Sequence, residues 1–180
     1  MSLLIRKTEC ATVQGKMAGF MADVTVVIHR FLSEWLPEIG RDDWWEQHVI
    51  GFFSDSQVRM IKEKRVTTLA GLDLAALVKV FSRNLSTLRY KASLPQEIGH
   101  HLIELSHIRN RWAHIGVDGY PDADVYRDLD TLYRLLEELD ADEKYKSTIR
   151  EARDGFFKTE VKPVVREQVE SAENTSSYSV

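Results

Sequence analysis

The sequence predicts an all-α protein, built as a bundle of amphipathic helices. Apolar residues recur at spacings of three and four along most of the 180 residues, which is the period of a helix with one buried face. Helix-breaking residues are sparse, with 9 glycines and 4 prolines. No alternating run of β-branched residues is long enough to predict a strand.

The first long helix is expected from residue 17 or 18 to Leu36. Pro37 and Gly40 follow at once and predict its end. Residues 2–14 are compatible with a separate short helix upstream. The predicted buried face of the long helix consists of Met21, Val24, Ile28, Phe31 and Trp35.

Three polar signals predict the helix starts that follow. Asp42-Asp43 before Trp44-Trp45 indicates an acidic first turn with a large aromatic anchor for the core. Ser54-Asp55-Ser56 predicts the cap of a short basic helix that runs to about Arg65. After a turn around Gly71, Asp73 is the expected N-cap of a long helix. The inward side chains of that helix are expected to be Leu74, Leu77, Val78, Phe81, Leu85 and Leu88.

The next helix is expected to open at Pro95, a first-turn position where proline loses no hydrogen bond. We expect it to reach about His114 and to stop near Gly116. After the Gly119-Tyr120-Pro121 turn, Asp122 is the expected cap of another helix. The inward residues of this helix are expected to be Val125, Leu129, Leu132, Leu135, Leu136 and Leu139.

The C-terminal part of the chain predicts two further amphipathic helices, at 142–158 and 160–170. The last residues, 171–180, are small and polar, so they cannot bury enough apolar area to order themselves.

Composition bounds the class of protein. The length fits one domain with its own core. Cys10 is the one cysteine, which excludes an internal disulfide or a thiolate zinc site and favours a reducing, cytoplasmic compartment. We expect no signal peptide and no membrane-spanning segment, because no window reaches 18 apolar residues. The sequence has no glycine-rich phosphate loop, so the chain alone is not predicted to be an ATPase.

The net charge of −4 conceals a partition of charge along the chain. Residues 1–58 carry 5 basic and 8 acidic side chains, and residues 115–180 carry 9 and 16. Residues 59–114 carry 10 and 4, a net charge of +6. This block indicates an electropositive face, although solvated helix faces without a binding function give the same count.

The residues with the clearest chemistry lie at the end of the helix that follows Pro95. Arg109 is followed by Asn110 and, after three more residues, by His114. This string resembles the R-x4-6-H signature of the HEPN superfamily in its sharper R-N-x3-H form. Asp43-Trp44-Trp45 and the helices expected at 72–88 and 122–139 are similar to one HEPN subgroup. That subgroup occurs in eukaryotic mRNA quality-control endonucleases and at the start of prokaryotic, often defence-associated, ATPases or helicases.

The resemblance implies an HEPN-like helical bundle of four to five core helices with additional terminal helices. It divides the chain into an N-terminal extension at 1–17 and an HEPN-like domain at 18–140. A C-terminal helical extension at 141–170 and a disordered tail or linker at 171–180 follow.

The resemblance also implies metal-independent RNA cleavage, with no cofactor, across a homodimer interface. The products would be a 2′,3′-cyclic phosphate and a 5′-hydroxyl. Histidine changes charge near neutral pH, so His114 can take the 2′-hydroxyl proton or protonate the leaving oxygen. Arg109 would stabilise the pentacoordinate transition state, and Asn110 would orient His114 or the phosphate. RNA contacts are expected from Arg111, His107, Arg83, Arg89 and Lys91.

Helix geometry separates the members of the motif. Asn110 and His114 share a face, whereas Arg109 and His114 are about 140° apart. On the ideal wheel Arg109 falls in the apolar stripe, so it either reaches around the helix end or is a buried, paired arginine. A two-fold axis beside this helix would join two polar faces into a composite site, so we expect a homodimer.

Rival interpretations exist for several of these residues. His100, Glu104 and His107 share a helix face, but the second half of a di-iron site is missing, so we expect no functional metal. Tyrosine-directed HEPN toxins carry a tyrosine where this chain has Gly116, which disfavours that subtype. Tryptophans at helical spacing are more often core than base-stacking residues. Arg83-Asn84 is interpreted as a partly buried polar pair.

Two functions therefore follow from the sequence. The first is an HEPN-type endoribonuclease acting as a homodimer, as part of an RNA-targeting or anti-phage defence system. The alternative is a non-catalytic HEPN module for dimerisation or RNA binding, attached to or partnered with a larger ATPase or helicase. The intact Arg109, Asn110 and His114 favour the first.

Overall fold

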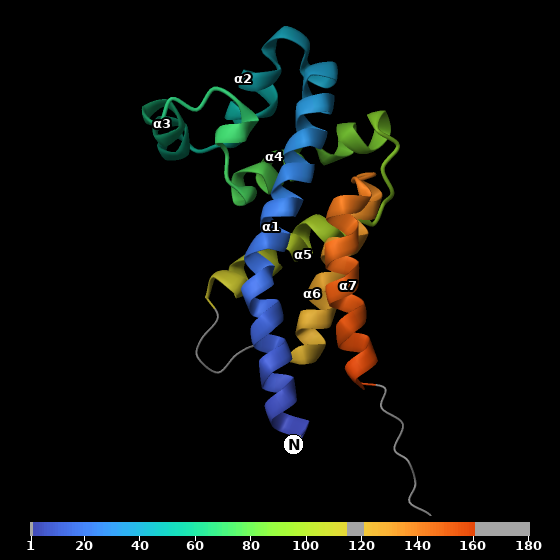
Figure 1. The fold of residues 1–180 in the computed structure, drawn as a ribbon. Coiled ribbons are helices and arrows are strands. Elements are labelled where there is room, and N and C mark those ends of the chain that lie inside the picture. The colour runs from blue at the N-terminus through green and yellow to red at the C-terminus, as the bar shows by residue number, and fades with distance from the viewer. Residues whose placement is uncertain (1, 115–120, 161–180) are drawn as a thin grey trace, which may run out of the picture.

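The structure, a computed structural model, describes residues 2–114 and 121–160, with side chains at 15–114, 121 and 123–155. The described residues form helices joined by turns and no strand, which confirms the predicted all-α class (Figure 1). The long helix α1 (Ser2–Gly40) runs along the bundle, and α6 (Asp122–Glu138) and α7 (Glu143–Glu160) pack beside it.

The elements between α1 and α6 form the other part of the bundle and carry the predicted site. Figure 1 shows α3 projecting to one side, while α4 and α5 cross behind α1. The four α-helices are α2 (Trp44–His48), α3 (Asp55–Glu63), α4 (Leu74–Lys91) and α5 (Ile98–Ala113). Three short 3-10 turns lie between them: η1 (Arg41–Asp43), η2 (Ile50–Phe52) and η3 (Leu69–Gly71).

The first helix is longer than predicted at both ends. The separate helix expected at 2–14 is wrong, because α1 is continuous from Ser2. Gly15 is the one weak helix former at that junction, and a single glycine costs a helix only about 1 kcal/mol. Pro37 lies inside the helix and does not end it. Proline removes the one hydrogen bond to the carbonyl of Ser33, and α1 tolerates this loss because Ser33 is exposed to water.

The caps confirm two of the predicted helix starts, and two other helices start at residues different from those predicted. Ser54 caps α3 in a reciprocal capping box with Gln57, and the Asp73 side chain accepts a hydrogen bond from the Ala76 backbone at 2.8 Å. Pro95 was expected to open α5, but Glu97 is the N-cap, because residues 96–97 form a second turn before the helix begins. Similarly, the N-cap of α6 is Pro121, and Asp122 is the first helical residue.

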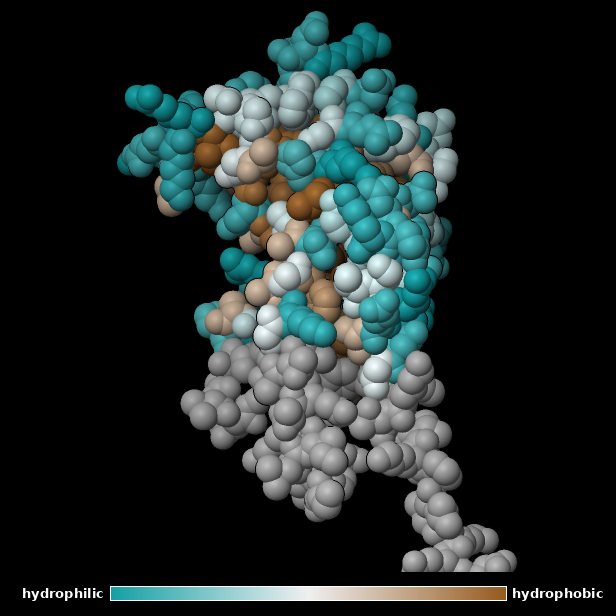
Figure 2. Space-filling model, in the orientation of Figure 1, coloured by the Kyte–Doolittle hydropathy of each residue, from teal (hydrophilic) through white to brown (hydrophobic). Residues whose placement is uncertain are grey.

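Most of the predicted inward residues are buried, and the other four are partly buried against the core: Met21, Trp35, Leu74 and Leu85. The six predicted for α6 are all buried, and the rings of Phe31 and Phe81 stack at 5.0 Å between α1 and α4. Trp44, Trp45 and Trp112 pack against this core, as predicted. In the view of Figure 2, hydrophilic residues cover α3 and α7, and hydrophobic residues gather between them.

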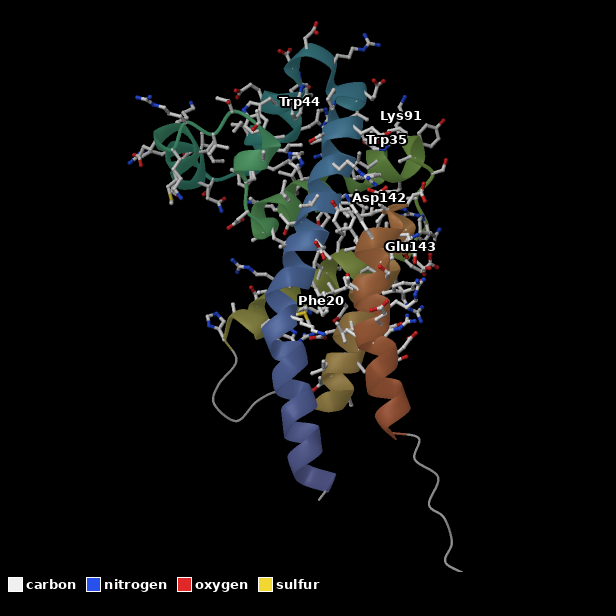
Figure 3. All side chains as sticks on the ribbon, viewed as in Figure 1. Phe20, Trp35, Trp44, Lys91, Asp142 and Glu143 are labelled. Carbon is white, nitrogen blue, oxygen red and sulfur yellow. The ribbon has the colours of Figure 1, made fainter. Side chains whose placement is uncertain are left out.

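The C-terminal helix packs against the bundle. Helix α7 lies along α6 and contacts α1. Arg30 of α1 donates to Asp142, just before α7, at 2.8 Å (Asp142 is labelled in Figure 3). The helix predicted at 160–170 lies outside the described residues beyond its first residue, as does the whole tail at 171–180. None of the helices in the described part of the chain has both the length and the apolar character needed to cross a bilayer.

Gly40 is required where α1 turns into α2. A Cβ there would lie 2.5 Å from Cδ2 of His48 and 2.6 Å from Cβ of Trp44. The His48 ring cannot move freely, because its Nδ1 lies 2.7 Å from Oδ1 of the buried Asn84. We therefore expect Gly40→Ala to lower the free energy of unfolding by about 1–3 kcal/mol, measured by urea denaturation.

Gly19→Ala is the matched control for this prediction. A Cβ on Gly19 meets no atom within 4 Å, and the residue lies inside α1. Alanine there should stabilise the helix by about 0.5–1 kcal/mol. Equal effects of the two substitutions would contradict the steric explanation.

Candidate functional site

The predicted motif lies where two antiparallel helices meet. The first turn of α4 and the last turns of α5 line a hollow of about 100 Å³, formed by Leu74, Ala75, Val78, Leu105, Ser106, Arg109 and Asn110. At the other end of the pair, a Cβ on Gly99 would lie 3.1 Å from Leu85 Cδ2. The motif is therefore opposite the beginning of α4.

The three predicted catalytic residues are all exposed in the last turn of α5. The Arg109 guanidinium donates from Nη1 to Oδ1 of Asn110 at 3.1 Å. His114 is the C-cap of α5, and its backbone N–H donates to the carbonyl of Arg111 at 3.1 Å. No hydrogen bond joins the His114 ring to the described part of the chain.

Arg109 is not the buried, paired arginine that was one of the two expectations. It is exposed because α4 begins at Leu74, so this helix covers α5 only as far as the motif. The other expectation fits better, since the bond to Asn110 directs Arg109 around the helix toward the face shared by Asn110 and His114.

A buried carboxylate on α6 holds the middle of the motif. Asp128, only 1% exposed, accepts from Nη2 of Arg111 at 2.5 Å and from Nε1 of Trp112 at 2.9 Å. These bonds orient Arg111 and Trp112 toward α6, which leaves the other side of α5 open for Asn110 and His114. Asp128 is therefore a positioning residue for the last turn of α5.

Asp128 was missed in the sequence, although a signal was present. It stands three residues after Val125 and one before Leu129, inside the apolar stripe of α6. A carboxylate in such a stripe needs buried donors to compensate for its desolvation. The sequence could have indicated a buried partner but not which residue supplies it.

The predicted RNA-binding residues occupy different environments. Arg83 and Lys91 are exposed on α4, and Arg89 is half-buried. His107 is exposed on α5, with its Nδ1 3.9 Å from Oε1 of Glu104. Arg111 forms an ion pair with Asp128, which is a structural contact within the chain. Its contact with RNA remains a prediction.

The Arg83-Asn84 pair is partly buried, as predicted, because its two residues lie in different environments. Arg83 is exposed, whereas Asn84 is buried and donates to the carbonyls of His48 at 2.9 Å and Val80 at 2.8 Å. Adjacent helical residues point about 100° apart, which accounts for the separation. Asn84 therefore joins α4 to α2.

The other features of the described residues offer less chemistry. No group of three His, Cys, Asp or Glu side chains within the described ranges is arranged to hold a metal ion. A hollow of about 440 Å³ between α1 and α7 contains none of the predicted site residues. The end of α5 remains the candidate site.

Comparison with known families agrees with the geometry. A family model described as Swt1-like HEPN matches residues 24–140, a range that includes the C-terminal part of α1, the motif and all of α6. Comparisons with curated proteins and with solved structures give no match. The family match takes in well over half of the 180 residues and includes Arg109, Asn110 and His114. The chain belongs to the Swt1-like HEPN family.

Proposed function

We propose that this protein is an endoribonuclease that cleaves RNA without a metal ion, with Arg109, Asn110 and His114 as its catalytic residues. The observation that carries the proposal is the intact R-N-x3-H string at the end of α5, with all three side chains exposed and Arg109 bonded to Asn110. In this proposal a cation, an amide and an imidazole act on one phosphate.

The proposed reaction is an internal attack. One histidine takes the 2′-hydroxyl proton as the 2′-oxygen forms a bond to phosphorus, and the bond from phosphorus to the 5′-oxygen breaks. A second group acts as the acid and protonates the leaving 5′-oxygen. Arg109 stabilises the negative charge that develops on the phosphorane oxygens. The products are a 2′,3′-cyclic phosphate and a 5′-hydroxyl.

In this proposal the acid that protonates the leaving oxygen comes from a second copy of the chain. The exposed face of α5 carries Ile103 at 56% exposure, within a stripe about 60° wide that it shares with His107, Asn110 and His114. Burial of Ile103 against a second copy would remove its apolar surface from water. A two-fold axis at this stripe would bring the two His114 side chains to one substrate.

Ile103→Glu tests the dimer interface. We expect the wild-type protein to be a dimer, and Ile103→Glu to be a monomer whose RNA cleavage is reduced at least about 100-fold, since two buried like charges oppose association. Val26→Glu, at an aliphatic position of α1 with 47% exposure, should remain dimeric and active. The measurements are light scattering after gel filtration and cleavage assays; a monomeric, active wild type would contradict the proposal.

A modified substrate tests the reaction itself. Single-stranded RNA and the same strand with 2′-deoxy nucleotides are incubated with the protein in excess chelator. The proposal predicts cleavage of the RNA and none at the deoxy positions, because the attacking 2′-oxygen is missing there. Equal cleavage of both strands, or no cleavage of RNA by the dimer, would count against it.

A further inference from the structure

The exposed face of α4 has an unusual composition. Lys79, Arg83, Ser86 and Tyr90 follow at spacings of four, three and four, so they form one stripe along the helix. Ser82 and Ser86 add hydroxyls, and α4 contains four basic residues and no acidic one between Leu74 and Lys91. The stripe, which we call the α4 stripe, consists of Lys79, Ser82, Arg83, Ser86 and Tyr90.

The cations of α4 also lack carboxylate partners. Among the described residues, none of the ion pairs within 4.0 Å includes a basic side chain of α3 or α4. Basic residues of α6 and α7 are paired instead, as in Arg127 with Asp124 and Arg153 with Asp130. The half-buried Lys79 donates to Oε1 of Gln57 at 3.0 Å, and its Nζ lies 5.0 Å from the centre of the Phe53 ring. Both of these partners are neutral, and Arg83 is exposed, so no carboxylate competes with an external anion for the charge of the α4 stripe.

Tyr90 adds a feature that a merely solvated basic face does not need. Its side chain is 85% exposed, the highest value among the exposed large hydrophobic residues of the described chain. An aromatic ring with an open face beside cations is the usual platform on which an unpaired base stacks. A duplex keeps its bases stacked inside and could not use this ring.

The end of the α4 stripe opposite Tyr90 points along α4 toward the motif. Ala75, in the first turn of α4, is exposed and lines the same hollow as Arg109 and Asn110. From Ala75 to Tyr90 the helix rises about 22 Å, enough for several nucleotides. Figure 3 labels Lys91, which follows Tyr90 at the end of α4 remote from the last turn of α5.

We propose that the α4 stripe binds single-stranded RNA that leads into the motif, with its cations on the phosphates and a base stacked on Tyr90. This inference rests on the proposed RNA-directed function and names the class of RNA and its path. Tyr90 sets how tightly the strand is held at the end away from the motif.

The test measures RNA binding separately from cleavage. Fluorescence anisotropy with a labelled single strand of about 12 nucleotides is recorded against salt concentration, in the His114→Ala background. We expect Tyr90→Ala to weaken binding about 5- to 100-fold with an unchanged salt slope, because stacking releases no counterions. Tyr90→Phe keeps the ring and should bind like the parent.

Replacing a cation of the α4 stripe should change the salt dependence of RNA binding, which replacing Tyr90 should not. Arg83→Ala should reduce the salt slope by about 0.7, the value for one phosphate contact with a single strand. Arg127→Ala, on α6, is the matched control and should change neither slope nor affinity. Unchanged binding by Tyr90→Ala, equally tight binding of a duplex of the same sequence, or an equal slope change in the control would overturn the proposal.

The two proposals fail differently. If RNA binding follows these expectations but neither wild type nor His114→Ala cleaves RNA, the α4 stripe stands and the nuclease proposal falls. If cleavage depends on His114 but Tyr90→Ala binds like its parent, the nuclease proposal stands and the α4 stripe falls.

Discussion

Replacing His114 by alanine is expected to lower RNA cleavage by about 10²–10⁴-fold, the range that general acid–base catalysis contributes. His114 is the C-cap of α5 and is exposed, so its removal should leave folding almost unchanged. The measurement is the single-turnover rate at saturating protein. The loss should therefore appear in the rate and not in the affinity for RNA.

Two further variants sharpen this prediction. Arg109→Ala should lower the rate by about 10²–10³-fold, because it removes the cation proposed to stabilise the phosphorane. His100→Ala replaces another exposed histidine of α5, nearly three turns before Asn110, and should cleave like wild type. Comparable losses in His100→Ala and His114→Ala would show that the effect is not specific to the motif.

Asp128→Ala is expected to have the largest effect on stability. It removes the acceptor of both Arg111 and Trp112 from a site where the carboxylate is only 1% exposed. Breaking a buried pair in this way costs about 3–5 kcal/mol, and the 29% exposure of the Arg111 side chain should reduce the loss to about 2–4 kcal/mol. Urea denaturation provides the measurement.

The same substitution should also affect cleavage in molecules that remain folded. Asp128 orients the middle of the motif, and a displacement of about 1 Å at a catalytic group can cost about 10²-fold in rate. Rates are therefore compared at a temperature where Asp128→Ala is fully folded. Asp124→Ala, which breaks the exposed pair with Arg127 on the same helix, should change stability by less than about 1 kcal/mol and leave the rate intact. A folded Asp128→Ala with the wild-type rate would contradict the positioning role.

Local signals account for most of the fold that the sequence could predict. Ser54 and Asp73 cap their helices with side-chain bonds to residues three positions on, so a short stretch of sequence contains both partners. The apolar stripe of α6 likewise depends on spacing alone. Pro95 and Asp122 were misplaced because the first helical residue depends on the path of the preceding turn.

The sequence names the residues of the candidate site but does not give their geometry. Arg109, Asn110 and His114 were identified by their spacing and by resemblance. The exposure of Arg109 depends on where α4 begins, which is a property of the packing between two helices. Asp128 meets Arg111 across a helix interface that no local pattern specifies. The unpaired cations of α4 likewise emerge only from the distances between helices.

The non-catalytic alternative makes opposite predictions at the same residues. A module that only dimerises or docks RNA would need the α5 face and the α4 stripe, but it would have no use for the His114 imidazole. Binding of RNA by wild type and by His114→Ala, with cleavage by neither, would favour that function.

The identity of the product ends tests the central claim most directly. Wild-type protein and His114→Ala are each incubated with a defined single-stranded RNA in excess chelator, and the fragments are analysed by mass spectrometry. Internal attack by the 2′-oxygen predicts 2′,3′-cyclic phosphate and 5′-hydroxyl ends from wild type, and neither above background from His114→Ala. Fragments with 5′-phosphate ends, or equal yields of cyclic phosphate from the two proteins, would contradict the proposed catalytic role of the motif.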